Sequence, residues 1–353
     1  MPAMNRIVHV IGTGNVGEPL IGLLADFRDD FGIDEVTFTK RSPLAHERAK
    51  VESLSRRGAQ LCVDRDMREE FIRQGHSPTY DAQEALERAS VVIDCTPAAN
   101  RNKSTYLDMQ GPVGYIAVGG TEFGFGKLYA NEINEGTLMP GEDRFIQVPG
   151  GNAHSLGYIV KLFGFDGDVN KVTSARFVCM RRCSDFSQER GFLPAPMVLP
   201  HDVERFGTRY AREAYYMFKT LGLELDLRSS VVLLPTQQMH CIWFSIEMER
   251  PLETMQAVER VQSSRLVAHT DKQSSTLMLA FARDHGYKGR IFSRIVVPTL
   301  ALSSTGNTTE GFCFEPQDSN ELLSAVAATI WFLYPNQVRQ RLEALAPYMF
   351  DEV

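Results

Sequence analysis

The sequence has few of the features that mark secreted, membrane-spanning or nucleic-acid-binding proteins. Its 353 residues include six cysteines, scattered and without a CxxC pair. This argues against a disulfide framework or a metal site and favours reduced thiols in a cytoplasmic protein. The most apolar run near the end, Ala325–Tyr334, is far shorter than the roughly 20 residues that span a bilayer, and the start shows no secretory signal peptide.

Positive charge is also scarce. The chain has 37 basic and 44 acidic residues, which gives a net charge of −7. An acidic chain is a poor generic binder of nucleic acid or of an anionic membrane surface, so neither is expected as a partner. The hydrophobic fraction of 43% and the charged fraction of 23% are ordinary for a globular protein and exclude a disordered or collagen-like chain.

The first third of the chain alternates strand and helix patterns. Alternation of this kind favours an α/β domain, in which a parallel sheet is covered by helices on both faces. The expected strands are Arg6–Ile11, Glu35–Lys40, Gln60–Val63, Ser90–Asp94 and Val113–Val118. The expected helices are Asn15–Phe27, Pro43–Arg57, Met67–Gln74 and Asp81–Arg88.

The pattern of strands and helices changes after about residue 144. A length of 353 residues by itself also favours roughly two domains. A strand, Phe145–Val148, leads into a helix, Asn152–Phe163. Longer strands with hairpin-like spacing then predict an α+β domain with an antiparallel or mixed sheet. Those strands are Lys171–Arg181, Val231–Leu234, Met239–Glu249 and Arg294–Leu302. The expected helices are His201–Leu221, Leu252–Val261, Ser274–Asp284 and Ser319–Leu345.

A glycine-rich motif follows the first strand and opens the first helix. In this context G-x-G-x-x-G indicates dinucleotide binding, because its glycines allow a tight turn, close approach of a pyrophosphate and close helix–strand packing. The alternative is a glycine turn that only joins a strand to a helix. The expected cofactor-binding residues of the motif are Gly12, Thr13, Gly14, Asn15, Val16 and Gly17.

The end of the second strand indicates which dinucleotide binds. The chain reads Thr39-Lys40-Arg41-Ser42, with two cations and no acid. An NAD site usually places Asp or Glu there for the ribose hydroxyls, whereas an NADP site has positive charge for the 2′-phosphate. Lys40 and Arg41 therefore favour NADP. NAD remains possible, since the two cations could also belong to a solvated strand end.

Two later loops complete the expected cofactor site. Asp94–Pro97 and Gly119–Gly120 each follow a strand, and the carboxyl ends of parallel strands border the ligand crevice. We therefore expect Thr96, Pro97, Gly119 and Gly120 to contact the cofactor. Cys95 is expected to line the crevice rather than to act as a nucleophile.

Several segments, in the same order along nearly the whole chain, resemble the archaeal-type (type II) glyceraldehyde-3-phosphate dehydrogenases. They are RGAQLCV at 57–63, DCTP at 94–97, AVGGTE at 117–122, MRRCSD at 180–185 and PTQQMH at 235–240. The resemblance implies a Rossmann domain at 1–149 completed by C-terminal helices at 317–353. It also implies an α+β substrate and oligomerisation domain at 150–316, NADP use and a homotetramer.

One residue that the family's chemistry needs is missing. Its members carry a nucleophilic cysteine just before an asparagine, at the start of the helix that follows the first domain. Aligning Asn152 with that asparagine places Gly151 at the cysteine position. Glycine offers no nucleophile, so a thioester at this position is excluded and phosphorylating activity is not expected.

The candidate catalytic residues are therefore His240, His154 and Asn152. His240 matches the histidine that serves as a base in the family, and histidine exchanges protons near neutral pH. The alternative for His240 is a hydrogen-bonded core histidine, and that for His154 is a solvent-facing helix residue. Arg181 and Arg182 match the arginines that bind the substrate anion, although a surface ion pair is equally open.

Two functions remain in competition. The first is an NADP-dependent oxidoreductase that acts on a small anionic carbonyl, alcohol or imine without a covalent intermediate. The second is a non-catalytic NADP(H)-binding pseudoenzyme that acts as a sensor or scaffold, as a homodimer or homotetramer. A cysteine elsewhere, with Cys183 the better placed, could also take over the thiol chemistry.

Overall fold

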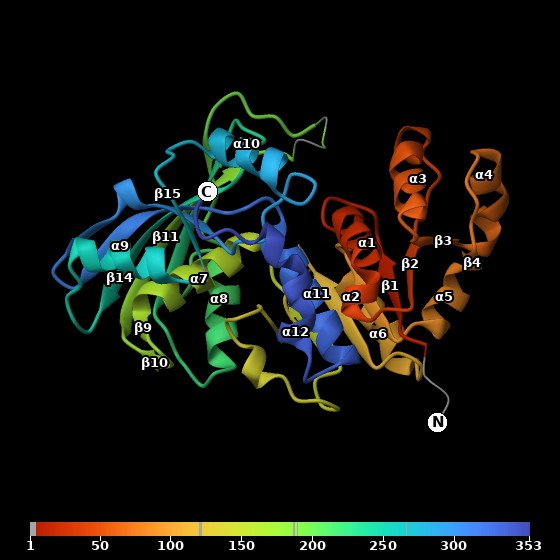
Figure 1. Cartoon of the computed structure of the whole chain (residues 1–353), viewed down its shortest axis with the longest axis horizontal. Coiled ribbons are helices and arrows are strands. Elements are labelled where there is room, and N and C mark those ends of the chain that lie inside the picture. Colours follow the sequence, from red (N-terminus) through yellow and green to blue (C-terminus); the bar gives the residue numbers. More distant parts are fainter. Residues whose placement is uncertain (1–4, 120–121, 186–187, 189, 266) are drawn as a thin grey trace. The chain divides into compact units, whose positions relative to one another are not determined.

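The computed structural model describes residues 5–119, 122–185, 188, 190–265 and 267–353. The chain forms two compact units (Figure 1). Unit 1 contains the residues up to Asn131 together with Leu138–Pro149 and Glu321–Ala344. Unit 2 contains Glu132–Thr137, Gly150–Asn320 and Leu345–Val353. The domain boundaries expected from the sequence, 1–149 with 317–353 for one domain and 150–316 for the other, remain a prediction.

Unit 1 is built on an eight-stranded sheet, all of whose paired strands run parallel. The strand order is β4-β3-β2-β1-β5-β6-β8-β7. The central strands are apolar and rich in β-branched residues, which suits strands buried on both faces. The strands are β1 (Ile7–Ile11), β2 (Glu35–Thr39), β3 (Gln60–Val63), β4 (Tyr80–Asp81), β5 (Val91–Asp94), β6 (Gly114–Val118), β7 (Lys127–Leu128) and β8 (Phe145–Val148).

Helices of unit 1 pack on this sheet through apolar faces. In the first helix Leu20, Leu23 and Leu24 are fully buried, as the helical spacing predicts. The helices are α1 (Gly17–Asp26), α2 (Arg28–Phe31), α3 (Arg48–Arg56), α4 (Arg68–Arg73), α5 (Ala82–Arg88), α6 (Ala99–Asp108), most of α11 (Ser319–Leu333) and α12 (Val338–Leu342). Short 3₁₀ turns, at Ala45–Glu47, Arg65–Met67, Glu135–Thr137, Thr299–Ala301 and Glu343–Tyr348, connect elements of the chain.

Unit 2 is built on a mixed sheet in the order β12-β13-β11-β14-β18-β16-β15, with β17 paired to β18. The β11–β13 and β15–β16 pairs are parallel and the other pairs are antiparallel. The strands are β11 (Val172–Arg182), β12 (Met197–Val198), β13 (Leu227–Leu234), β14 (Cys241–Met248), β15 (Ala268–Thr270), β16 (Val296–Pro298), β17 (Ser303–Thr305) and β18 (Thr308–Phe314), with a separate hairpin of β9 (Phe165–Asp166) and β10 (Val169–Asn170). The α/β and α+β fold class expected from the sequence is confirmed.

Helices cover one face of the unit 2 sheet. Alternate residues of β11 and β14, such as Phe177 and Phe244, are buried against that side. On the opposite face Val178, Trp243 and Phe312 lie side by side in register across three strands. The helices on the first side are α7 (Gly151–Gly164), α8 (Arg209–Lys219) and α9 (Thr254–Ser263). Helix α10 (Ser275–His285) instead packs against Phe314 and Cys241 on the opposite face.

Some expected elements were wrong in extent. The strand expected at Arg294–Leu302 is only β16, because Pro298 has no N–H for the ladder and a 3₁₀ turn follows. The helix expected from His201 begins only at Arg209, since Gly207 has φ +75° and the chain doubles back there. The last expected helix, Ser319–Leu345, is broken into α11 and α12 near Pro335.

Two elements were not expected from the sequence. Helix α6 is mostly polar, so it lacks the apolar stripe that predicts a helix. Strand β18 alternates buried residues with the exposed Glu310 and Phe312. Among the described residues, no helix combines the length and the apolar character that crossing a membrane requires.

Candidate functional site

The glycine motif of unit 1 forms the tight turn that its spacing predicts. Gly12 has φ +95°, a conformation that favours glycine. A side chain at Gly17 would collide with the carbonyl oxygen of Gly12, so only glycine lets α1 start this close to β1. Gly14 and the adjacent Asn15 are exposed, and a Cβ added at Gly14 would meet no atom within 4 Å. Backbone at this position is thus open to approach by a ligand.

The loop after β5 is held from within by a buried carboxylate. Asp94 accepts hydrogen bonds from the backbone N–H and the hydroxyl of Thr96 (2.9 and 2.6 Å), from the Asn102 amide (2.7 Å) and from the Tyr106 hydroxyl (2.7 Å). The methyl group of Thr96 in turn lies against Gly12. Burial, and then the neighbouring Asp94 charge, raise the pKa of the Cys95 thiol well above its ordinary value. A thiol in this setting suits a lining residue, not a nucleophile.

The remaining predicted loops of unit 1 are only partly described. Gly119 ends β6 with φ +85°, donates its N–H to Val148 (3.2 Å), and lies close to Val16 of the glycine motif. Pro97 is exposed after β5. Gly120, the other residue expected here, lies outside the described residues. The structure therefore brings Gly119 to the glycine loop.

The cations at the end of β2 differ from each other in their surroundings. Lys40 is 5% exposed, and its ammonium group forms an ion pair with Glu47. Arg41, the other predicted cation, is exposed. A third cation, which the sequence analysis missed, is Lys50 on α3. Its ammonium group contacts Glu47 (2.8 Å) and donates to the carbonyl oxygen of Thr13 (3.1 Å), a residue of the glycine loop.

In unit 2 the predicted residues gather at the start of α7. Gly150 is the N-cap residue and provides no side chain to cap the helix. Asn152 lies in the first turn, 4% exposed. His154 is fully buried, with Nδ1 3.3 Å from the Gly150 carbonyl oxygen and its ring tilted against Tyr158. The solvent-facing alternative for His154 is therefore wrong, because α7 is buried on nearly every side.

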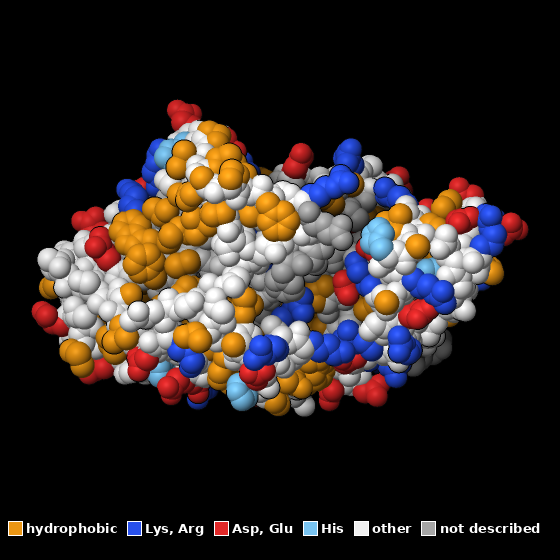
Figure 2. Space-filling view, turned by 90° about the horizontal axis from the view of Figure 1, so that it is seen from above, with side chains coloured by type: hydrophobic (Ala, Val, Ile, Leu, Met, Phe, Trp, Pro, Cys, Tyr) orange, Lys and Arg blue, Asp and Glu red, His pale blue; other side chains and the backbone are white. Residues whose placement is uncertain are grey.

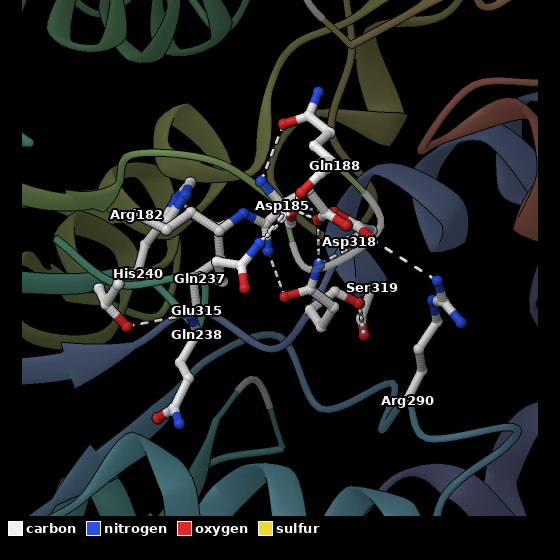
Figure 3. Close-up of polar contacts among 12 residues, drawn as sticks. Arg182, Asp185, Gln188, Gln237, Gln238, His240, Arg290, Glu315, Asp318 and Ser319 are labelled. Atoms are coloured by element: carbon white, nitrogen blue, oxygen red, sulfur yellow. Dashed lines mark hydrogen bonds and ion pairs between the residues drawn. The ribbon is translucent and has the colours of Figure 1, made fainter. Parts of the chain in front are cut away.

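His240 meets two polar side chains. Its Nδ1 lies 3.0 Å from the Asn152 amide nitrogen. It also lies 3.3 Å from Oε2 of Glu315 (Figure 3). Glu315 follows β18, is 6% exposed, and its backbone N–H donates to the His240 carbonyl oxygen (3.0 Å). Sequence analysis did not assign Glu315 to the site. Its proximity depends on pairing between β14 and β18, which are 75 residues apart at this point.

The other ring nitrogen and the amide oxygen have no partner. Among the described residues, His240 Nε2 and Asn152 Oδ1 are both buried without a hydrogen-bond partner. In one tautomer Nδ1 accepts the N–H of Asn152 and Nε2 carries the proton; in the other Nδ1–H donates to Glu315, the contact with the Asn152 amide is lost, and Nε2 presents a lone pair that can act as a base. Two buried polar atoms that lack partners favour a site for a polar ligand.

Glu315 also fills the space beside Gly151. A Cβ built on Gly151 would collide with Oε1 of Glu315. Gly151 does not adopt a conformation that demands glycine, so the limit here is space and not backbone strain. A carboxylate thus lies where the side chain of residue 151 would project.

Arg181 is a further candidate on β11. It follows Met180, which the antiparallel β11–β14 ladder pairs with Cys241, the residue after His240. The Arg181 guanidinium packs over the Tyr210 ring (5.6 Å), and its Nε is buried without a hydrogen-bond partner among the described residues. It can therefore donate to an anionic ligand.

Arg182 has different partners. Its guanidinium lies 2.7 Å from Asp185 and 3.2 Å from Asp318, and it also donates to Gln317 (Figure 3). Gln317 links the same two carboxylates, at 2.9 and 3.1 Å. Because these contacts already neutralise Arg182, Arg181 is the better candidate for binding an anion.

A second buried carboxylate, which sequence analysis did not assign to the site, lies at the N-cap of α7. Glu213 of α8 is 3% exposed and accepts a hydrogen bond from the Gly150 backbone N–H, while its Oε2 has no partner among the described residues. Burial raises the pKa of Glu213 to about 7, despite the opposing charges of Arg209 and Arg212. An acid of this kind can hold a proton at neutral pH. Its apolar neighbours on α8 give no hint of this role in the sequence.

Groups of side chains that could hold a metal ion were sought across the described ranges, and none was found. Unit 2 carries a group of acid, base, amide and guanidinium side chains, and unit 1, described by itself, carries a glycine loop with adjacent lysines.

Comparison with known proteins finds similarity along most of the chain. It is 24% identical over 304 residues to the glyceraldehyde-3-phosphate dehydrogenase of Hyperthermus butylicus, a match covering 85% of this chain and 83% of that protein. It is 23% identical over 308 residues to that of Methanobrevibacter smithii, covering 86% of each. It is 25% identical over 294 residues to that of Methanobacterium bryantii, covering 80% of each. No protein-family model matches the chain. The similarity supports the family resemblance that the sequence motifs indicate.

Proposed function

We propose that this protein is an NADP-dependent oxidoreductase that acts on a small anionic carbonyl, alcohol or imine without a thioester intermediate. The observation that carries the proposal is the contact between His240 and Glu315 beside Gly151. An imidazole and a carboxylate can move protons, and residue 151 offers no nucleophile. We therefore infer acid–base chemistry in this divergent member of the family.

Features of unit 1 favour NADP as the cofactor. The open backbone at Gly14 and the tight turn at Gly12 fit a pyrophosphate, and helix α1 begins there without a side-chain cap among the described residues. Lys40, Lys50 and Arg41 place positive charge after β2, which favours the 2′-phosphate of NADP. The names of the three relatives also fit a dehydrogenase.

When bound, a nicotinamide would supply or accept the hydride. His240 moves the accompanying proton through Nε2, while Glu315 holds the proton on Nδ1 and stabilises the imidazolium form. In reduction, His240 gives its proton to the carbonyl oxygen or imine nitrogen as the hydride reaches carbon. Asn152 Oδ1 accepts a hydrogen bond from the substrate, and Arg181 Nε binds its anionic group.

The substrate class follows from the same residues. Arg181 favours an anion, and the similarity to glyceraldehyde-3-phosphate dehydrogenases favours a phosphorylated aldehyde as the starting point for a search. Without a thiol, phosphate-dependent oxidation of glyceraldehyde 3-phosphate should stay at background. Oxidation at a rate typical of such dehydrogenases would mean that a cysteine forms the thioester elsewhere.

We also propose a cytoplasmic homo-oligomer. The sheet face opposite α7 exposes apolar side chains beyond the part that α10 covers, and Figure 2 shows many hydrophobic groups over unit 2. On this face Phe312 and Val198 are 36% and 77% exposed. Apolar surface of this kind is typical of a subunit interface.

The test begins with a screen of small anionic aldehydes, ketones and imines with NADPH. With a substrate in hand, His240→Asn should lower kcat by about 10²–10⁴-fold and leave NADPH affinity unchanged, since it removes only the proton-transfer group. His285→Asn on α10, an exposed histidine, is the matched control and should retain full rate.

His154→Asn separates the two catalytic candidates. We expect it to retain most of the wild-type kcat, whereas His240→Asn lowers it. A loss of kcat in His154→Asn alone would move the role to His154. Tight NADPH binding with no turnover of any compound in the screen would overturn the enzyme proposal in favour of the non-catalytic NADP(H)-binding alternative.

A further inference from the structure

Glu47 lies between two lysine side chains next to the glycine loop. Its carboxylate pairs with the ammonium group of Lys40, and at 2.8 Å with that of Lys50. Lys50 reaches the Thr13 carbonyl oxygen at 3.1 Å and lies 3.4 Å from Glu18 on α1. All of these residues belong to unit 1.

Burial distinguishes this cluster from an ordinary surface ion pair. The side chains of Lys40, Glu47 and Lys50 are 6%, 20% and 23% exposed. An ammonium group as buried as that of Lys40 requires an anionic partner, and removing that partner is costly. The pKa of Glu47 is lowered, because the two lysines outweigh the effect of burial, so it stays charged at neutral pH. Glu47 thus holds a permanent negative charge at a site with two converging cations.

A 2′-phosphate would require the same two cations. We propose that Glu47 is the residue that sets the choice between NADPH and NADH, by acting as an internal anion that the 2′-phosphate must displace. This inference rests on the proposed binding of a nicotinamide dinucleotide at the glycine loop. The open backbone at Gly14 fits that cofactor.

The same carboxylate favours the competing cofactor. NAD sites commonly use an acidic residue near the end of the second strand to accept hydrogen bonds from the ribose hydroxyls. The strand end itself has no acid, but Glu47 supplies one through its contact with Lys40. Glu47 therefore weakens NADPH binding and supports NADH binding. The wild-type protein should thus prefer NADPH over NADH less strongly than it would with the two lysines and no Glu47.

The test measures equilibrium binding by titration of the protein with NADPH and with NADH. In Glu47→Gln the ratio of the NADH to the NADPH dissociation constant should rise by about tenfold or more, because a charged competitor of the phosphate is gone. Glu52→Gln on α3 is the matched control: Glu52 is 40% exposed, and its ion pairs among the described residues are with Arg48 and Arg56. It should leave both constants unchanged.

A readout without any cofactor accompanies the titration. Glu47→Gln leaves Lys40 without its anion, so the variant should melt at a lower temperature, and inorganic phosphate should restore its Tm far more than it raises that of the wild type. If Glu47 only positions the lysines, NADPH affinity falls in Glu47→Gln and phosphate gives no selective rescue. That result would overturn the inference.

Lys50→Gln keeps the test valid if Glu47→Gln does not fold. This variant removes one cation that is partly exposed. It should weaken NADPH binding by about tenfold and leave the affinity for NADH nearly unchanged. Equal losses for both dinucleotides would mean that Lys50 merely holds the loop, and would count against the inference. Failure of the wild-type protein to bind either dinucleotide would instead overturn the proposed function itself.

Discussion

The carboxylate of Glu315 occupies the space into which a side chain at Gly151 would project. The two residues are 164 positions apart in the sequence, yet a Cβ on Gly151 would collide with Oε1 of Glu315. That same carboxylate contacts Nδ1 of His240 at 3.3 Å. The absence of a side chain at 151 and the presence of an acid at 315 are thus two aspects of one arrangement.

Gly151→Ala should therefore destabilise the protein only while Glu315 is present. The added methyl group overpacks the site, at an expected cost of about 1 kcal/mol, near the low end for such changes because a carboxylate at the end of a flexible side chain can shift. In a Glu315→Ala background the same change should stabilise by about 0.5–1 kcal/mol, since alanine favours helix over glycine. Denaturant unfolding of the four proteins measures the coupling. Additive effects would contradict the geometry.

Cys183 should be the cysteine that reacts first with iodoacetamide. Hydrogen bonds from the Leu193 backbone N–H and the Ser184 hydroxyl outweigh the opposing effect of burial and lower the pKa of its thiol. By contrast, burial raises the pKa of Cys241 to about 11 and that of Cys62 to about 12. Peptide mapping during the reaction would identify the labelled thiol.

The same cysteine provides a test of the non-covalent mechanism. Cys183→Ser should retain hydride transfer within about twofold, because no proposed step uses a thiol. Cys241→Ser, another change of a thiol to a hydroxyl, is the control. A loss of about 10²-fold or more in Cys183→Ser alone would indicate that thiol chemistry has moved to residue 183.

Much of the fold could be predicted from local patterns. The strand at Gln60–Val63 and that at Phe145–Val148 have the predicted bounds, because short apolar runs between turn residues specify buried strands. The glycine motif also specifies its own turn, since Gly12 and Gly17 each meet a local steric requirement. Such features depend on neighbours in the sequence.

The polar neighbours of the candidate site could not be predicted in this way. Glu315 reaches His240 only through the pairing of β14 with β18, and Glu213 reaches Gly150 only through the packing of α8 beside α7. Lys50 and Glu47 lie within the second predicted helix of the chain, Pro43–Arg57, where a charged residue ordinarily indicates a solvated face. Their role depends on the distance to Lys40 and Thr13, which sequence spacing does not give.

His9 should make the protein sensitive to acid. Its ring is fully buried in β1 between the hydroxyls of Thr37 (2.7 Å) and Thr39 (2.9 Å), and burial lowers its pKa to about 3. The unfolded chain, with an ordinary pKa near 6.5, binds more protons between these values, so stability rises with pH from about 3 to about 6.5. On acidification, protonation linked to His9 alone lowers the free energy of unfolding by up to about 5 kcal/mol.

His9→Gln keeps hydrogen-bonding capacity but cannot become charged. The variant should be less stable than the wild type at about pH 8 because of imperfect packing, and should lose less stability on acidification, so the two curves converge. His46→Gln, at an exposed position, is the control and should follow the wild-type slope. Parallel curves for wild type and His9→Gln, from urea unfolding at several pH values, would show that His9 is not the responsible group.

Glu213 should act in the opposite direction at higher pH. Burial raises its pKa to about 7 from an ordinary 4.5, so the folded protein binds more protons than the unfolded chain between those values. The contribution of the protonated acid to the free energy of unfolding is thus complete below about pH 4.5. It is lost as pH rises through about 7, by about 3 kcal/mol in total.

Glu213→Gln can still accept the Gly150 N–H bond but never ionises. Its free energy of unfolding relative to the wild type should therefore increase by about 2–3 kcal/mol from about pH 5 to about pH 8. Glu259→Gln on α9 is the exposed control, and should show no such trend. A constant difference between Glu213→Gln and wild type across this range would mean that Glu213 is already ionised in the folded protein, and would remove it as a holder of a proton at the start of α7.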